Sequence, residues 1–267
     1  MQDDISFRKK SFGELADDYQ KYRKPYNKKL YDFIFSLLNG KGQKIKILDI
    51  GCGTGKSTEP LLTNCPDQLK NRIEVTGCDH DQKMLEQAIQ SAKEKALNIK
   101  YVDGSAEMLP FDGDSFDCVI AGTAFHWFAT RDAFAEIKRV IKENGFFLVF
   151  WADPVNFEKD GKIVGAEIYK KYKKDSIIKP WRDLEKTKAL FEESGFRDFK
   201  SEKFSEMQEF TLEELVGRHK TTSKYATLSL DDKKTYISEF ENAYKELFKD
   251  KDVVASEREL TACYAFK

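Results

Sequence analysis

The stretch that decides the fold reads ILDIGCGTG and covers residues 47–55. Apolar residues surround a single aspartate, Asp49, and glycine then occupies positions 51, 53 and 55. Such a run is typical of a buried strand of a parallel sheet that ends in a turn before a helix. Because glycine permits positive φ and carries no Cβ, the backbone of this turn can approach a ligand closely. A tight turn without a ligand is the alternative.

Strand-like and helix-like segments alternate through the following hundred residues. We expect strands at 44–50, 73–79, 98–104, 116–122 and 145–152, and helices at 56–64, 81–95 and 130–142. This rhythm predicts an α/β fold with a doubly wound parallel sheet, which binds ligands at the carboxyl ends of its strands. Residues 11–38 also have helical spacing, which Pro25 interrupts.

After Trp151 the alternation gives way to loops and charged helical patterns. Residues 195–204 and 260–266 read as further strands, and residues 211–255 read as helical. We therefore expect a single domain of three parts. These are an N-terminal helical lid segment at 1–40, a ligand-binding core at 41–152, and a helical cover at 153–267 that includes the last strands of the sheet.

The composition excludes several classes of function. The 267 residues carry 45 Lys and Arg against 46 Asp and Glu, so there is no basic excess for a general nucleic-acid partner. The five cysteines are dispersed without CxxC spacing, which predicts reduced thiols in a cytoplasmic protein and no metal site. There is no N-terminal apolar segment and no run of 18 apolar residues, so we expect no membrane partner.

The glycine spacing argues against two common nucleotide-binding motifs. A dinucleotide loop, G-x-G-x-x-G, would need glycine at position 56, where the chain has Lys56. A phosphate-binding loop would need G-K-[ST] at a spacing that the GKS of residues 55–57 does not provide. A nicotinamide-dependent enzyme is therefore disfavoured.

Together these segments resemble the class I S-adenosylmethionine (SAM)-dependent methyltransferases. LDIGCGTG is similar to their first motif, VTGCDHDQKML (75–85) to the second, and GSAEMLPFDGDSFDCVIAGTAFHWF (104–128) to the segment with the third and fourth. YRKPY (22–26) and AFHWF (124–128) further resemble the group that contains trans-aconitate methyltransferase, with a methyltransferase type 11 domain. The resemblance implies a Rossmann-like seven-stranded sheet, SAM as cofactor and S-adenosylhomocysteine as product.

The resemblance also implies which residues bind SAM. Asp79, at the end of a strand, can accept hydrogen bonds from both ribose hydroxyls, and the alternative is that it caps the next helix. Met84 would pack beside the adenine or simply in the core. Tyr19 and Tyr22 would close over the cofactor or form an ordinary amphipathic helix. The predicted cofactor-binding residues are Asp49, Gly51, Cys52, Gly53, Thr54, Gly55, Asp79, His80, Met84, Ser105, Ala106, Tyr19, Tyr22 and Arg23.

The AFHWF segment follows the fourth strand, where the reacting methyl group should lie. His126 is a candidate for lining the acceptor pocket and for a general base, and the alternative is a structural histidine. The predicted acceptor pocket comprises Phe125, His126, Trp127, Trp151 and Arg218, although some of the aromatic residues could instead close the core. A carboxylate acceptor would need no base but would need a cation, for which the candidates are Arg23, Arg182, Arg218 and His219.

We therefore predict a SAM-dependent methyltransferase that acts on a small molecule, with a carboxylate as the leading acceptor. Because the cofactor brings the electrophile, orientation and exclusion of water should supply most of the rate, and we expect no metal. The alternatives are a carbon or nitrogen methyltransferase of the same fold and a SAM-binding protein without catalysis. A monomer or a homodimer is expected.

Overall fold

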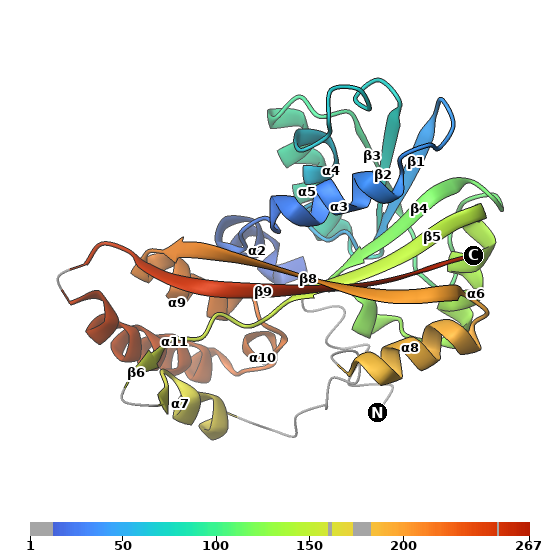
Figure 1. Cartoon of the computed structure of the whole chain (residues 1–267). Helices are drawn as coiled ribbons and strands as arrows, with labels where there is room; N and C mark the ends of the chain where they lie inside the picture. Colours follow the sequence, from blue (N-terminus) through green and yellow to red (C-terminus); the bar gives the residue numbers. More distant parts are fainter. Residues whose placement is uncertain (1–12, 160–161, 173–182, 250) are drawn as a thin grey trace. The chain divides into compact units, whose positions relative to one another are not determined.

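The computed structural model describes residues 13–159, 162–172, 183–249 and 251–267. In these residues seven strands form one mixed sheet, in the order β3-β2-β1-β4-β5-β9-β8 (Figure 1). Its strands are β1 Ile45–Ile50, β2 Ile73–Asp79, β3 Ile99–Asp103, β4 Phe116–Gly122, β5 Ile141–Ala152, β8 Arg197–Phe210 and β9 Val254–Phe266. Strands β1 to β5 pair in parallel, and β9 is antiparallel to β5. The seven-stranded, doubly wound fold is thereby confirmed.

The helices of the described residues begin mostly at side-chain caps. They are α2 Ala16–Tyr22, α3 Lys28–Leu37, α4 Pro60–Thr63, α5 Gln82–Glu94, α6 Arg131–Val140, α7 Ala166–Lys171, α8 Leu184–Glu193, α9 Leu212–Lys220, α10 Ser223–Ala226 and α11 Leu230–Lys245. A short ribbon pairs β6 (Glu158–Lys159) with β7 (Lys162–Ile163). The predicted break at Pro25 is confirmed, because α2 ends before it and the Asn27 side chain caps α3.

The prediction of a helix at 56–64 is wrong in its extent. Only Pro60–Thr63 form a regular helix, and turns occupy the residues before it. The amides of Thr58 and Glu59 both donate to the Gly55 carbonyl, so the chain makes a single tight turn here before Pro60 starts the helix. The loop amides after Gly55 therefore do not form the N-terminus of a long helix.

The last two strands are longer than the sequence predicts. Strand β8 continues to Phe210, and β9 begins at Val254 inside the segment expected to be helical. Burial alternates along the second half of β8, but the partly buried positions include Glu206 and Gln208. Because polar side chains occupy inward positions, the period-two apolar pattern of a strand is hidden in this sequence.

The chain forms two compact units. The sheet unit comprises the described residues within 24–152, 179–204 and 260–267, and the helical unit comprises those within 1–23, 153–178 and 205–259. Strands β8 and β9 contribute residues to both units. Each unit has its own apolar core.

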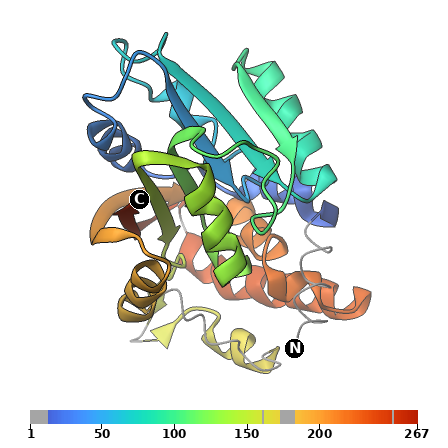
Figure 2. The same ribbon diagram turned by 90° about the vertical axis from the view of Figure 1, so that its right-hand side faces the viewer.

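The sheet unit buries side chains on both faces of its sheet. On one face Phe134 of α6 and Phe191 of α8 pack against Phe147 of β5, and the rings of Phe147 and Phe191 stack with centroids 5.2 Å apart. On the other face α3 packs Tyr31 and Ile34 against the alternate strand residues. Helix α5 lies alongside β3 (Figure 2). The strands thus have apolar residues on both faces, as a doubly wound sheet requires.

The helical unit is built around α2, α7, α9 and α11. Its buried residues include Phe210, Tyr236 and Phe240. Helix α9 carries Gly217, and a Cβ at this position would collide with the ring of Tyr22 from α2. The glycine therefore lets the two helices approach closely.

We expect Phe191→Ala to destabilise the protein by about 3–5 kcal/mol, because it empties a fully buried site between α8 and the sheet. Denaturant unfolding followed by circular dichroism measures this change. The control is Lys188→Ala on the exposed side of the same helix, which should alter the free energy of unfolding by less than about 0.5 kcal/mol. Equal effects of the two substitutions would contradict this account of how α8 is held.

Candidate functional site

The ends of β1 and β2 bring the predicted cofactor-binding residues of the sheet unit together. Ile50 of β1 is in register with Cys78 of β2, so Gly51 and Asp79 follow at the same edge of the sheet. The amides of Gly51 and Cys52 both donate to the Cys78 carbonyl, over 2.8 and 3.2 Å. The glycine loop is therefore hydrogen-bonded to the end of the neighbouring strand from its first residue.

The Asp79 carboxylate holds this loop from the side. Its Oδ2 accepts a hydrogen bond from the Gly53 amide at 2.8 Å, and its Oδ1 accepts one from the Asp81 amide at 3.0 Å. The cap of helix α5 is Asp81, whose carboxylate accepts from the amides of Lys83 and Met84. The alternative interpretation of Asp79 as the helix cap is therefore wrong, and the buried Asp79 carboxylate faces the glycine loop.

The glycine loop has the backbone conformation that close approach of a ligand would need, and open space lies beside Gly53. Gly51, Gly53 and Gly55 have φ of 66°, 54° and 84°, in the region that favours glycine. A Cβ added at Gly53 would meet no heavy atom within 4 Å beyond its chain neighbours. Nearby, Asp49 Oδ1 and Thr54 Oγ1 are buried without a hydrogen-bond partner among the described residues. Free space beside the Gly53 backbone, next to buried polar atoms that still need hydrogen-bond partners, fits the polar amino-acid end of SAM.

Asp49 is fully buried and has two hydroxyl partners. Its Oδ2 accepts hydrogen bonds from Ser57 Oγ at 2.6 Å and Thr58 Oγ1 at 2.7 Å. Burial raises the pKa of Asp49 to about 7, although the two hydroxyl bonds act in the opposite direction, and the charge of Asp79 raises it further. The sequence analysis missed Ser57 and Thr58, although Ser57 belongs to the GKS triplet that invites comparison with a phosphate-binding loop.

Other predicted cofactor residues lie around the same strand ends. The Gly104 amide donates to the Asp79 carbonyl at 3.1 Å, and so brings the Ser105–Ala106 segment to the end of β2. Ala106 and Met84 are buried, whereas His80 is about half exposed with its Nδ1 3.4 Å from Asp79 Oδ1. Cys52 is buried too, and burial raises the pKa of its thiol.

Three predicted cofactor residues belong instead to the helical unit. Tyr22 is buried against Gly217, and its hydroxyl donates to Glu213 at 3.2 Å. Arg23 Nε donates to Thr221 Oγ1 at 2.7 Å, and its guanidinium lies over the ring of Tyr19. The structure therefore gathers Tyr19, Tyr22 and Arg23 with α9 and does not place them in the unit that holds the glycine loop.

The AFHWF segment divides between the core and a partly buried turn. Phe125 packs among the core aromatic rings and is 3% exposed, and Trp151 is 4% exposed in the same core cluster. Both were predicted to line the acceptor pocket, and this stays a prediction, with both side chains packed in the core cluster. His126 and Trp127 are partly buried, with ring centroids 4.7 Å apart.

A contact that the sequence analysis missed lies just before this turn. Thr123 has a φ of 53°, and its hydroxyl accepts a hydrogen bond from the Tyr26 hydroxyl at 2.9 Å. The Tyr26 ring also packs edge-on against Phe150. Tyr26 is the last residue of the YRKPY motif, so the signal was present, but its partner could not be known without the fold.

The helical unit gathers guanidinium groups around Arg218. Burial lowers the pKa of Arg218, and the charges of Arg23 and Arg258 lower it further. Arg258 is almost fully buried and donates to Gln208 Oε1 at 3.0 Å and to the Asp153 carbonyl at 3.1 Å. The candidate Arg182 lies outside the described residues.

The prediction of His219 as a cation is wrong. Burial lowers the pKa of His219 to about 3, and the neighbouring charges of Arg218 and Arg23 act in the same direction. Its imidazole is therefore neutral at physiological pH.

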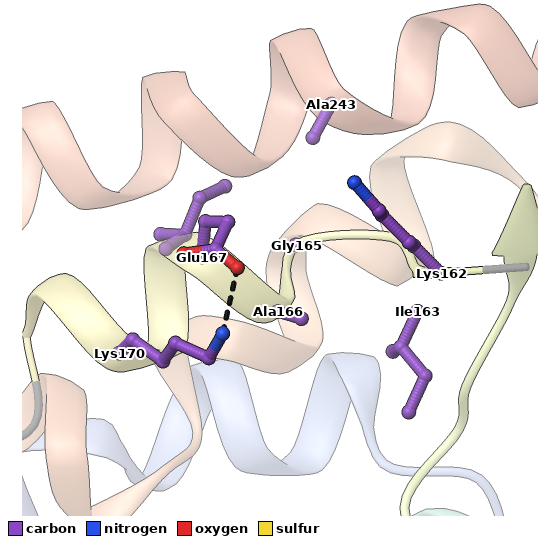
Figure 3. A pocket seen from close by; sticks show the side chains of 8 residues that line it. Lys162, Ile163, Gly165, Ala166, Glu167, Lys170 and Ala243 are labelled. Carbon is purple, nitrogen blue, oxygen red and sulfur yellow. Dashed lines mark hydrogen bonds and ion pairs between the residues drawn. The ribbon is translucent and has the colours of Figure 1, made fainter. Parts of the chain in front are cut away.

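A pocket of about 490 Å³ opens in the helical unit between the segment 162–170 and α11. Figure 3 shows an ion pair between Glu167 and Lys170, 2.7 Å apart, at its wall. Its lining residues are Lys162, Ile163, Gly165, Ala166, Glu167, Ile168, Lys170 and Ala243. None of the predicted site residues lines this pocket.

The described residues contain neither a cluster of metal ligands nor a membrane-spanning helix. No cluster of three His, Cys, Asp or Glu side chains is arranged to hold a metal ion. None of the helices has the length and apolarity to span a bilayer.

The glycine loop lies in a part of the chain that matches a known protein family. Residues 48–149 match the family described as a methyltransferase domain. Over 211 residues the chain is 31% identical to an uncharacterized methyltransferase-like protein of Schizosaccharomyces pombe, an alignment that covers 77% of this chain and 75% of that protein. The chain belongs to the class I SAM-dependent methyltransferases.

This methyltransferase is similar to other proteins over most of its length. It is 26% identical over 244 residues to a protein from Paenibacillus sp. (strain JDR-2) named malonyl-[acyl-carrier protein] O-methyltransferase, covering 85% of this chain and 84% of that protein. Its fold is similar to that of a putative type II methyltransferase from Anaeromyxobacter dehalogenans, with a TM-score of 0.65 at 15% identity. That comparison covers 92% of this chain and 97% of the other.

We expect the stability of the methyltransferase to carry a pH dependence that Asp49→Asn removes. Between about pH 4 and pH 7 the Asp49 carboxyl is ionised in the unfolded chain but protonated in the folded protein, so its contribution lowers stability as the pH rises. The difference in unfolding free energy between wild type and variant should therefore change by a few kcal/mol across this window. Urea unfolding at several pH values measures it, and parallel curves would contradict the raised pKa.

We expect Asp79→Ala to weaken SAM binding by about 100-fold or more, because it removes the carboxylate that holds the Gly53 amide and faces the loop. Isothermal titration calorimetry measures the affinity. Asp103→Ala is the matched control, since Asp103 ends β3 in register with Asp79 but is exposed, and its affinity should stay at the wild-type value. Unchanged affinity in Asp79→Ala would refute the role assigned to this carboxylate.

Proposed function

We propose that this methyltransferase transfers a methyl group to a carboxylate oxygen of a small molecule. The proposal rests on the arginine and tyrosine side chains around Arg218. The neighbours that act most on its pKa are Arg23, Arg258 and two tyrosines, Tyr169 and Tyr19, and no carboxylate is among them. Arg258 is buried and Arg23 and Arg218 are partly buried. Like charges gathered out of water are costly unless an anion joins them, so this cluster supports an anionic ligand.

A carboxylate suits both the cluster and the reaction. It is ionised at neutral pH, so its oxygen can attack without a general base, and guanidinium groups bind it with paired hydrogen bonds. SAM, when bound, supplies an electrophilic methyl group. Arg218 and Arg23 would orient the acceptor, and the surrounding side chains would exclude water. On this proposal the reaction needs no general base, so His126 does not act as one.

The cofactor would be held by residues of the sheet unit. We propose that the loop Gly51–Gly55, with Asp49 and Thr54, binds the amino-acid end and that Asp79 accepts the ribose hydroxyls. Ser105, Ala106, His80 and Met84 would lie near the adenine. Arg23 was predicted as a cofactor residue. We propose instead that it binds the acceptor, because its charge lowers the pKa of Arg218.

The relatives support oxygen as the acceptor atom, since the Paenibacillus protein is named as an O-methyltransferase. The YRKPY and AFHWF motifs support our further proposal that the chain belongs to the group containing trans-aconitate methyltransferase. All five cysteines are free and buried, which supports a reducing, cytoplasmic location. A monomer or homodimer without nucleic-acid partners is proposed.

We expect methyl-labelled SAM, incubated with the protein and a small-molecule extract of its source cells, to yield a labelled product that mild base converts to methanol. Such lability identifies a methyl ester. Label that resists base would place the methyl group on carbon, nitrogen, sulfur or an ether oxygen. No label, with SAM binding intact, would favour a binding protein without catalysis.

We expect Arg218→Gln to lower kcat/KM for the labelled acceptor by about 100-fold or more, since it removes a partly buried guanidinium proposed to pair with the acceptor charge. The affinity for SAM should not change. Arg197→Gln, at an exposed arginine at the start of β8, is the control and should retain wild-type kinetics. If both variants kept wild-type kinetics, the arginine cluster would not be the acceptor site.

A further inference from the structure

A chain of three polar aromatic side chains runs through the helical unit beside the arginine cluster. Tyr169 comes from α7, His219 from α9 and Tyr244 from α11. The Tyr169 hydroxyl lies 3.3 Å from His219 Nδ1, and His219 Nε2 lies 2.9 Å from the Tyr244 hydroxyl. Because three separate helices supply these groups, packing of the whole unit brings them together.

The middle residue of this chain is fixed in position. The imidazole of His219 is 5% exposed and stacks on the ring of Phe240, with centroids 3.5 Å apart. Since its pKa is lowered to about 3, the ring stays neutral, with one nitrogen that donates and one that accepts.

The hydroxyl of Tyr244 determines which nitrogen accepts. Tyr244 is 4% exposed, and burial raises its pKa, so its hydroxyl keeps its proton. A buried hydroxyl must donate its proton to an acceptor. His219 Nε2 lies 2.9 Å from the Tyr244 hydroxyl, closer than the 3.3 Å between His219 Nδ1 and the Tyr169 hydroxyl. With Nε2 accepting, Nδ1 carries the ring proton and donates to the oxygen of Tyr169. Tyr169 then has its own proton left to donate to a ligand.

The position of Tyr169 indicates the charge of that ligand. Burial raises the pKa of the Tyr169 hydroxyl to about 12, and the charges of Arg218 and Arg23 act in the opposite direction, so the hydroxyl is a neutral donor. The residue as a whole is 43% exposed, so part of the side chain lies at the surface although the hydroxyl itself is desolvated. A neutral O–H donor beside two guanidinium groups suits an anion that accepts hydrogen bonds.

We propose that Tyr169 is a further acceptor-binding residue, whose hydroxyl donates a hydrogen bond to the carboxylate held by Arg218 and Arg23. His219 and Tyr244 are positioning residues for that hydroxyl. The proposal rests on the carboxylate acceptor of the proposed function. The opposite proton arrangement would make the chain purely structural, because Tyr169 would then donate to Nδ1 and have no proton for a ligand.

The first test reads the tautomer of His219 directly. The chain has three histidines, His80, His126 and His219, so nitrogen NMR of the full-length, histidine-labelled protein can assign each ring. We expect His219 to be neutral with its proton on Nδ1 from about pH 5 to pH 8. Tyr244→Phe should shift the proton towards Nε2, because that nitrogen loses its donor. A wild-type ring with its proton on Nε2 would overturn the proposal.

The second test uses succinate as a probe carboxylate, titrated into the full-length protein while the His219 ring signals are followed. Tyr169→Phe keeps the ring and removes only the hydroxyl, and it should weaken succinate binding about tenfold. Tyr172→Phe removes a hydroxyl just beyond the end of the same helix and is the matched control with wild-type binding. Wild-type affinity in Tyr169→Phe would overturn the proposal.

The two proposals fail in different ways. If succinate binds in a manner that depends on Tyr169 but no base-labile product forms, the anion site stands and the reaction assigned to it is wrong. If the methyl ester forms and Tyr169→Phe retains the wild-type KM for its acceptor, the role of Tyr169 is wrong and the reaction stands.

Discussion

The hydrogen bond from the Gly53 amide to the Asp79 carboxylate joins the two motifs on which the sheet unit depends. One motif ends β1 and the other ends β2, and the parallel register of these strands places both at one edge. Asp49 stabilises the residues that follow this loop, because its carboxylate accepts hydrogen bonds from the hydroxyls of Ser57 and Thr58. A loop with three residues at positive φ would otherwise be free to adopt many conformations, so these carboxylates preorganise it.

Much of the sheet unit could be predicted from the sequence because its signals are local. Buried parallel strands read as apolar runs, and the glycines and Asp79 follow them at the positions where ligands bind in this fold. The extent of α4 could not be predicted, because the turn at Gly55–Glu59 depends on hydrogen bonds that have no side-chain signature. The contacts of Asp49 with Ser57 and Thr58 were missed for a related reason. Hydroxyl residues suit many environments, and only the fold shows which one they occupy.

The helical unit was harder to predict because its determinants are distant in the sequence. All of residues 41–152 lie between Arg23 and Arg218 in the sequence, yet the charge of Arg23 lowers the pKa of Arg218. Phe125 and Trp151 were predicted to line the acceptor pocket, and the sequence did not show that both side chains pack in a core cluster. His219 was taken for a cation because sequence does not reveal burial, and burial reverses that interpretation.

The buried carboxyl of Asp49 also links the occupancy of the loop to the protons in solution. A group with a pKa of about 7 is divided between its two protonation states near neutral pH. When a positively charged molecule binds beside it, the charged form is favoured, and a fraction of a proton must leave the protein. The heat measured on binding would then include the ionisation heat of the buffer that takes up this proton. If the cofactor binds this loop as proposed, the aspartate that stabilises the loop also makes the extent of binding depend on pH.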